Sequence, residues 1–273
     1  IRDGAPSRGL GDVYKRQVLM FANQKGGAGK TTTAQETAYL LSKSNTVLLI
    51  DLDGQRNLTT NLEPEETEWK NTIYDLFMET EELSDCIYEV RKNIDIIPGH
   101  RKILSQYFIS PEDIYKLKKI VDEIKTYEVY DYILIDVGPE GGQLMTMAMV
   151  ASDYIVALAE PGKNSYQGLL QMAKDLDSCQ NIINSFKTKV IGILITQAKL
   201  NTNIIRNSKE RLQALAEVLG TSVFNSIIRE STIVKEAIEF NQFLTEYAPD
   251  SNVADDYARY GKELVKRLKE ANK

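Results

Sequence analysis

Residues 18–41 combine a short apolar run, a glycine-containing loop and a helical pattern, in that order. Residues 18–22 are all apolar and suit a buried strand, while Ala34, Ala38 and Leu41 recur at helical spacing. The loop between them reads Lys25-Gly26-Gly27-Ala28-Gly29-Lys30-Thr31-Thr32. Its backbone N–H groups and the positive end of the following helix would both attract an anion. The chain is therefore restricted to folds in which a phosphate-binding loop joins a strand to a helix.

The loop departs from the ordinary phosphate-binding pattern at one end. It keeps Gly29-Lys30-Thr31, but Gln24 stands where that pattern begins with glycine, and a second lysine, Lys25, follows. Such a loop is either a degraded nucleotide site or a specialised one. The intact order of strand, loop and helix favours the specialised site over a glycine turn without a ligand.

Carboxylates follow two other apolar runs. Residues 46–50 lead into Asp51 and Asp53, and residues 132–135 lead into Asp136. Ligands of an open parallel sheet lie at the carboxyl ends of its strands, so these three aspartates would meet Lys30 and Thr31. A phosphate-bound Mg²⁺ needs only one or two protein oxygens. One aspartate after a strand is common in turns, but three together favour a nucleotide and metal site.

These segments together resemble the ATPase motifs of the ParA/Soj partition proteins. The resemblance covers the loop 25–32, the segment 51–59, the strand that ends at Asp136 with Pro139 after it, and the later stretches 227–237 and 251–264. The loop alone would also fit the wider family that includes MinD, nitrogenase iron protein and bacterial tyrosine kinases. The match is specific because the motifs occur as a set.

The resemblance implies that ATP and Mg²⁺ are the ligands. Lys30 would hold the β- and γ-phosphates, Thr31 would reach Mg²⁺, Thr32 would lie near the α-phosphate, and Asp53 would position the attacking water. Asp51 and Asp136 would belong to the surroundings of the metal. The nucleotide-binding set is then Gly26, Gly27, Ala28, Gly29, Lys30, Thr31 and Thr32.

The same resemblance assigns the extra lysine to a second subunit. Two protomers would form a homodimer around two ATP molecules, and Lys25 would reach the nucleotide of the partner. There it would act as an arginine finger supplied in trans does, together with Lys30 and Asp53 as catalytic residues. The chain departs from the family at Gly54 and Gly138, where proline is usual, and at Arg56, where glycine is usual. These changes leave hydrolysis expected and its rate open.

The first seventeen residues are set apart from the rest. Residues 12–17, Asp-Val-Tyr-Lys-Arg-Gln, are what GATGTGTATAAGAGACAG encodes, which is a transposon end used to tag DNA for sequencing. We therefore interpret 1–17 as a non-native, adapter-derived leader and 18–273 as a single ATPase domain. The leader carries four basic and two acidic residues, so the remainder is even more acidic than the net charge of −6.

An acidic chain binds DNA only through a local basic surface. Two clusters provide one: Lys199, Arg206, Lys209 and Arg211 with Arg229, and a second in the last helix at 259–273. Alone, each would be read as a solvated helix face. The resemblance instead implies nonspecific DNA binding by the ATP dimer, with Lys199, Arg206, Lys209 and Arg229 as the candidate residues.

Predicted strands and helices alternate along the chain, as expected for an α/β fold, a mainly parallel twisted sheet with helices on both faces. We expect strands at 18–22, 46–51, 94–98, 132–136, 154–159, 190–195 and 223–228, and helices at 31–44, 111–127, 143–151, 165–186, 203–219, 232–240 and 254–270. No apolar run approaches a membrane span. Cys86 and Cys179 lack metal spacing, which favours a reduced, cytoplasmic setting. The DNA binding that the resemblance implies would in addition associate the protein with the nucleoid.

Three functions fit this pattern. The first is a partition ATPase whose ATP dimer binds DNA and is released when a ParB-type centromere-binding partner stimulates hydrolysis. The second is a MinD-like positioning ATPase on a membrane, but the tail 266–273 offers only Leu268 as a bulky apolar residue. The third, a bacterial tyrosine kinase, would need a tyrosine-rich tail, whereas the 14 tyrosines are scattered. The first is the predicted function.

Overall fold

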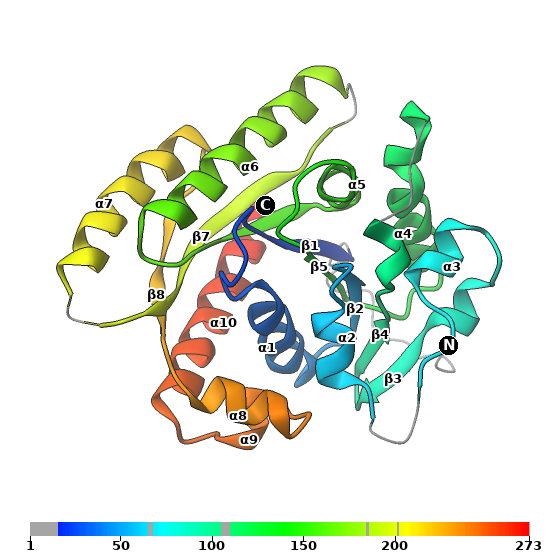
Figure 1. Ribbon diagram of the computed structural model, residues 1–273, viewed down its shortest axis with the longest axis horizontal. Coiled ribbons are helices and arrows are strands. Elements are labelled where there is room, and N and C mark those ends of the chain that lie inside the picture. Colours follow the sequence, from blue (N-terminus) through cyan, green and yellow to red (C-terminus); the bar gives the residue numbers. More distant parts are fainter. Residues whose placement is uncertain (1–15, 65–67, 105–109, 184–185, 201, 273) are drawn as a thin grey trace.

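The strands form one eight-stranded sheet. The computed structural model describes residues 16–64, 68–104, 110–183, 186–200 and 202–272. The strands lie in the spatial order β3-β4-β2-β5-β1-β6-β7-β8, and every neighbouring pair is parallel except β3 and β4 (Figure 1). The strands are β1 (Gln17–Ala22), β2 (Val47–Leu52), β3 (Tyr88–Arg91), β4 (Ile94–Ile97), β5 (Tyr132–Val137), β6 (Tyr154–Ala159), β7 (Lys189–Ala198) and β8 (Val223–Arg229). The predicted α/β fold with a mainly parallel sheet is confirmed.

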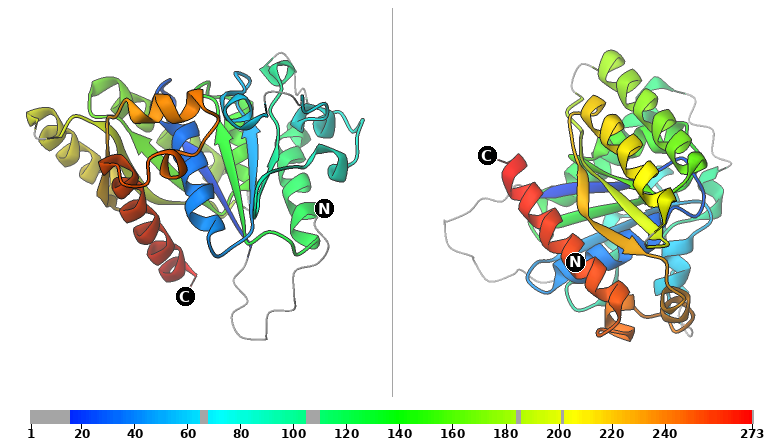
Figure 2. Two further views of the ribbon diagram at one scale, coloured as in Figure 1. Left: turned by 90° about the horizontal axis from the view of Figure 1, so that it is seen from below. Right: turned by 90° about the vertical axis from the view of Figure 1, so that its left-hand side faces the viewer.

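Helices cover both faces of the sheet because both faces of its central strands are apolar (Figure 2). In β1, Val18 and Met20 point into one core, while Leu19 and Phe21 point into the other. The first core lies under α3 (Ile73–Phe77), α4 (Lys116–Thr126), α5 (Gln143–Ala151), α6 (Lys163–Ile182) and α7 (Asn203–Val218). The second lies under α1 (Lys30–Ser42), α2 (Asn57–Leu62), α8 (Ile233–Glu239), α9 (Leu244–Tyr247) and α10 (Asn252–Ala271).

The elements missing from the sequence-based prediction are short. Strand β3 was not predicted; it pairs with β4 through the two-residue turn Lys92-Asn93, in which Asn93 has the left-handed φ of 65°. Helices α2, α3 and α9, together with 3₁₀ turns at Leu83–Cys86 and Arg101–Leu104, were also not predicted. The predicted helix 111–127 divides into a 3₁₀ turn, Pro111–Tyr115, followed by α4. Segments this short contain too few turns for a helical period to emerge.

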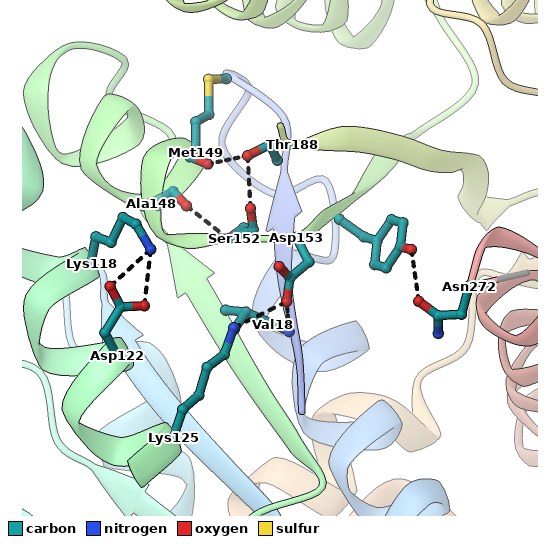
Figure 3. A network of polar contacts seen from close by, with 11 residues as sticks. Val18, Lys118, Asp122, Lys125, Ala148, Met149, Ser152, Asp153, Thr188 and Asn272 are labelled. Atoms are coloured by element: carbon teal, nitrogen blue, oxygen red, sulfur yellow. Dashed lines mark hydrogen bonds and ion pairs between the residues drawn. The ribbon is translucent and has the colours of Figure 1, made fainter. Parts of the chain in front are cut away.

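Polar contacts join the amino ends of the central strands (Figure 3). The Asp153 carboxylate, just before β6, accepts a hydrogen bond from the Val18 backbone N–H at 2.9 Å and pairs with Lys125 at 3.3 Å. The Thr188 hydroxyl, just before β7, lies 2.6 Å from the carbonyl of Met149 and 2.7 Å from that of Ser152. These contacts stabilise the end of the sheet that lies opposite the glycine loop.

Residues 1–15 of the predicted leader lie outside the described residues. Gln17, its last residue, is described: it begins β1 and pairs with Tyr132. Both cysteines are buried and free. Among the described helices, none has the length and apolar character needed to cross a membrane.

Candidate nucleotide-binding site

Two glycines give the loop between β1 and α1 its curvature. Gly27 and Gly29 have φ of 78° and 77°, the left-handed region in which a side chain is strained. Gln24 is not among the positive-φ residues of the described chain, so its position does not need glycine. Gly29 immediately precedes α1, whose first turn contains no acidic side chain. The backbone N–H groups at this helix start therefore face a position suited to an anion.

Lys30 lies inside the loop and is 6% exposed. Its Nζ donates a hydrogen bond to the carbonyl oxygen of Lys25 at 3.2 Å. Burial lowers the pKa of Lys30, while the charges of Asp136, Asp53 and Glu140 oppose that shift. The structure thus brings Lys30 together with two of the predicted aspartates and adds Glu140, a residue that the sequence reading did not single out.

Asp51 and Asp136 sit side by side on adjacent strands. They are register partners in the β2–β5 pair, and both are fully buried. Burial raises the pKa of Asp136 well above its usual value and the charge of Asp51 raises it further, while Thr31 and Lys30 lower it. Neither carboxylate oxygen of Asp136 has a hydrogen-bond partner of good geometry in the described part of the chain. A buried carboxylate without such a partner fits a cation as its ligand.

Asp51 is, in contrast, fully hydrogen-bonded by its own chain. It accepts hydrogen bonds from the backbone N–H groups of Asp53 at 3.0 Å and Thr59 at 2.8 Å, and from the Thr59 hydroxyl at 2.6 Å. Burial raises its pKa to about 6 against these hydrogen bonds. The Thr59 hydroxyl in turn accepts from the N–H of Gly99 at 2.8 Å. Asp51 therefore links the ends of β2 and β4 to the start of α2.

Asp53 lies at the entrance of the same cluster and is 4% exposed. Its carboxylate accepts from the Gln55 N–H at 2.8 Å, which sets the turn after β2. Arg56 follows with φ of 59°, the left-handed region, which explains why glycine is usual there in the family that the sequence resembles. Its Nε donates to the Gly99 carbonyl at 3.0 Å, a contact that glycine cannot make.

Side chains from β7 hold the far side of the loop. The Thr196 hydroxyl donates to the Ala28 carbonyl at 2.9 Å, and the Gln197 amide donates to the Gly27 carbonyl. Gln197 has the positive φ of 51°. Neither residue was predicted from the sequence. Gln197 and the Gly27 carbonyl that it contacts are 170 positions apart, and no local sequence pattern links residues so far apart.

Lys25 does not point at the cluster around Lys30. Its ammonium forms an ion pair with Glu160, the residue after β6, and the two side chains are 29% and 33% exposed. Asn23 and Gln24, just before it, are held by the same region through Ser165 and Asp175. Glu160, Ser165 and Asp175 were not predicted as site residues.

The predicted DNA-binding residues gather at the carboxyl ends of β7 and β8 and the start of α7. Ala198, next to Lys199, is the register partner of Arg229. Lys199 pairs with Glu230 at 3.6 Å, and the Arg229 guanidinium donates two hydrogen bonds to the buried Asp256 at 2.6 and 2.9 Å. Arg206 and Lys209, by contrast, have no ion pair with any described residue, and they lie three positions apart on α7.

No group of three or more His, Cys, Asp or Glu side chains with metal-binding geometry occurs in the described ranges. A phosphate-bound Mg²⁺ needs only one or two protein oxygens. The Thr31 hydroxyl and the Asp136 carboxylate are the groups that fit such a cation, since they approach the Lys30 side of the loop.

Comparison with known proteins points to one family. Residues 16–193 match the family model described as AAA domain, AAA_31. The chain is 28% identical over 256 residues to the sporulation initiation inhibitor protein Soj of Bacillus subtilis, covering 91% of this chain and 98% of Soj. It is 26% identical over 256 residues to the chromosome partitioning protein ParA of Caulobacter vibrioides, covering 92% and 94%.

Solved structures agree in fold. Apo McdA of Cyanothece superposes with a TM-score of 0.79 at 24% identity, over 92% of this chain and 99% of McdA. A protein of Borrelia burgdorferi described as a plasmid partition protein, bound to AMPPNP, has a TM-score of 0.72 at 25% identity, over 94% and 100%. The AMPPNP bound to that neighbour agrees with the expected ATP. A further structure of this fold, cobyrinic acid a,c-diamide synthase from Mycobacterium smegmatis at 22% identity and a TM-score of 0.76, over 93% of this chain and 96% of the synthase, holds an ATP analogue with magnesium, consistent with the expected Mg²⁺. The chain belongs to the ParA/Soj family of P-loop ATPases, with an AAA domain of the AAA_31 type.

Proposed function

We propose that this chain is an ATP-hydrolysing partition protein whose ATP-bound homodimer binds DNA nonspecifically. Hydrolysis, stimulated by a ParB-type centromere-binding partner, would release the dimer and so segregate plasmid or chromosomal DNA. The observation that carries the proposal is that the two lysines of the loop have different surroundings. Lys30 lies buried near the acids of its own site, whereas the Lys25 side chain is partly exposed and pairs with Glu160 instead.

In this proposal each residue of the site has a task. Lys30 and the loop N–H groups bind the phosphates of ATP, and Thr31 with Asp136 would hold Mg²⁺, which neutralises phosphate charge when bound. Asp53, held by the turn after β2, accepts a hydrogen bond from the attacking water and orients it. Asp51 keeps this turn in place through Thr59. Lys25 of one protomer then stabilises charge on the phosphoryl group that the other protomer transfers.

Nonspecific DNA binding is proposed for the surface at the carboxyl ends of β7 and β8. Arg206 and Lys209 on α7 supply cations without an acid of their own, so phosphates would be their partners. Lys199 and Arg229 already have acidic partners, and DNA would have to compete with Glu230 and Asp256 for them. The protein would accordingly be cytoplasmic and associated with the nucleoid.

A MinD-like membrane function is the less favoured alternative. Leu268, the bulky apolar residue of the carboxyl-terminal segment, is 1% exposed. It packs in the same core as Tyr260 and Leu264 of α10. A helix that uses its apolar face for the core has little left to insert between lipids.

The two lysines give the decisive test. Lys30→Ala should abolish binding of a fluorescent ATP analogue, because it removes the phosphate contact inside the protomer. Lys25→Ala should keep nucleotide affinity within about twofold and lose ATP-dependent dimerisation or hydrolysis, measured by sedimentation and phosphate release. Equal loss of nucleotide binding in both variants would contradict the role in trans.

DNA and membrane are separated by parallel co-sedimentation with ATP, using a long DNA duplex and anionic liposomes. We expect retention on DNA that falls steeply with salt and weakens in the Arg206→Ala/Lys209→Ala variant. The Lys118→Ala variant is the control, because it also removes a basic side chain but on the distant helix α4. Retention on liposomes but not on DNA would refute the partition proposal.

A further inference from the structure

The start of the glycine loop and the β6–α6 junction form a continuous set of contacts. The Asn23 amide, which is buried, donates to the Leu158 carbonyl at 2.6 Å and to the Ser165 hydroxyl at 3.0 Å. The Gln24 amide donates to Asp175, and the Lys25 ammonium pairs with Glu160. Three consecutive residues of the loop are thus bound to β6 and α6 of their own subunit.

Glu160 is held in position for this contact. Its backbone N–H donates to the Ser165 hydroxyl at 2.9 Å, and Ser165 is 1% exposed. Its side chain borders a cavity of about 220 Å³ between α6 and α7, which is also lined by Lys163 and Arg211. Two further basic residues therefore line the same cavity as Glu160.

In this structure the ammonium of Lys25 contacts Glu160, whereas in the proposed dimer it contacts a phosphate of the partner subunit. We infer that Glu160 is a positioning residue, which retains Lys25 in its own subunit and must release it before the ATP-bound dimer can close. The inference rests on the proposed dimer. Because both side chains are about one-third exposed, the ion pair is weak enough to exchange for a phosphate.

The size of the effect follows from the exposure of the pair. Exposed ion pairs change an equilibrium by about threefold. Each dimer releases two such pairs, so Glu160→Gln, which keeps the shape and removes the charge, should tighten ATP-dependent dimerisation about tenfold. Glu160→Asp keeps the charge on a shorter side chain and should restore part of the wild-type value.

Asp175→Asn offers a matched control, because it neutralises the neighbouring acid that holds Gln24 without touching Lys25. It should leave the dimer dissociation constant within twofold of wild type. A second measurement follows Lys25 directly: acetylation of nucleotide-free protein with a limiting reagent, quantified at Lys25 by mass spectrometry. Glu160→Gln should increase labelling of Lys25, and Asp175→Asn should not.

The outcomes separate this inference from the proposed function. If wild-type protein does not dimerise with ATP, the proposed dimer fails and the inference with it. If wild-type protein dimerises and Glu160→Gln leaves both the dissociation constant and Lys25 labelling unchanged, only the inference is overturned. The same holds if Asp175→Asn has the same effect as Glu160→Gln, because the contact would then act through general packing.

Discussion

Gly168 lies in the interior of α6, where that helix passes the start of the phosphate-binding loop. A Cβ added there would lie 2.1 Å from the Asn23 side-chain oxygen, 3.1 Å from the Gln24 carbonyl carbon and 3.2 Å from the Lys25 nitrogen. The last two atoms belong to the backbone and cannot rotate away. Asn23 is no more adaptable, because its amide makes three buried hydrogen bonds. Gly168→Ala must therefore push α6 and the loop apart.

The expected cost combines three effects. Overpacking a tight core costs about 1 to 3 kcal/mol, and each Asn23 hydrogen bond that is broken costs about 1 kcal/mol. Alanine offsets about 1 kcal/mol of this cost, because it is a better helix former than glycine. We expect Gly168→Ala to lower the free energy of unfolding by about 2 to 4 kcal/mol. That loss corresponds to a fall in Tm of about 5 to 15 °C for a chain of this length.

Gly261 in α10 is the matched control, since it too is a glycine inside a long helix. A Cβ there would lie 3.0 Å from the Leu40 Cδ1, the end of a side chain that can move. Gly261→Ala should therefore leave stability unchanged or raise it by up to about 1 kcal/mol. Urea unfolding followed by circular dichroism measures both variants, and a fluorescent ATP analogue should bind Gly168→Ala more weakly. Equal stability of the two variants would refute the close approach as the reason for glycine at 168.

Three further predictions concern charged side chains. Arg267→Ala should lower the free energy of unfolding, measured in urea, by about 2 to 4 kcal/mol. The reason is that the guanidinium donates to three backbone carbonyls and lies 4.0 Å from the centre of the Phe224 ring. A loss below about 0.5 kcal/mol would contradict this. Burial raises the pKa of Asp256, but the hydrogen bonds and charges of Arg229 and Arg259 outweigh burial, so the net pKa is lowered. The ionised carboxylate therefore stabilises the fold above about pH 4, and this stabilisation is lost as the pH falls through the lowered pKa. Asp256→Asn should consequently be less stable than wild type at pH 7, by a margin that shrinks below pH 4 in unfolding curves; a constant margin would exclude this linkage. The Arg56→Gly variant should be more stable than Arg56→Ala by about 1 kcal/mol in the same assay, because only glycine adopts the left-handed φ of residue 56 without strain. Equal stabilities would show that the backbone at residue 56 is not strained.

Much of the fold could be predicted from the sequence because both faces of its central strands are buried. Seven of the strands stand out as apolar runs, and the long helices repeat their apolar residues over several turns. β3 could not be found in this way. It is four residues long at the edge of the sheet, and its Lys92-Asn93 turn is a weak local signal.

The placement of the loop beside the acids that follow the strands could also be predicted from the sequence. Local order along the chain determines it: a strand, a loop with glycines at two left-handed positions, a helix, and acids that follow neighbouring strands. Lys30 and Asp136 accordingly lie together as the sequence predicted. The role of Lys25 in a second subunit remains a prediction from the family resemblance.

Only the tertiary structure decided which distant residues hold that loop and what its cations contact. Glu160, Ser165 and Thr196 lie more than 130 positions from the loop, and they reach it because parallel strands end at one edge of the sheet. In the same way, Arg229 pairs with Asp256 rather than standing free, a contact between a strand and a helix 27 positions apart. The sequence by itself determined the motifs, since these depend on neighbours along the chain. The partners of Lys25 and Arg229 depend on how the strands and helices pack, and no local pattern encodes them.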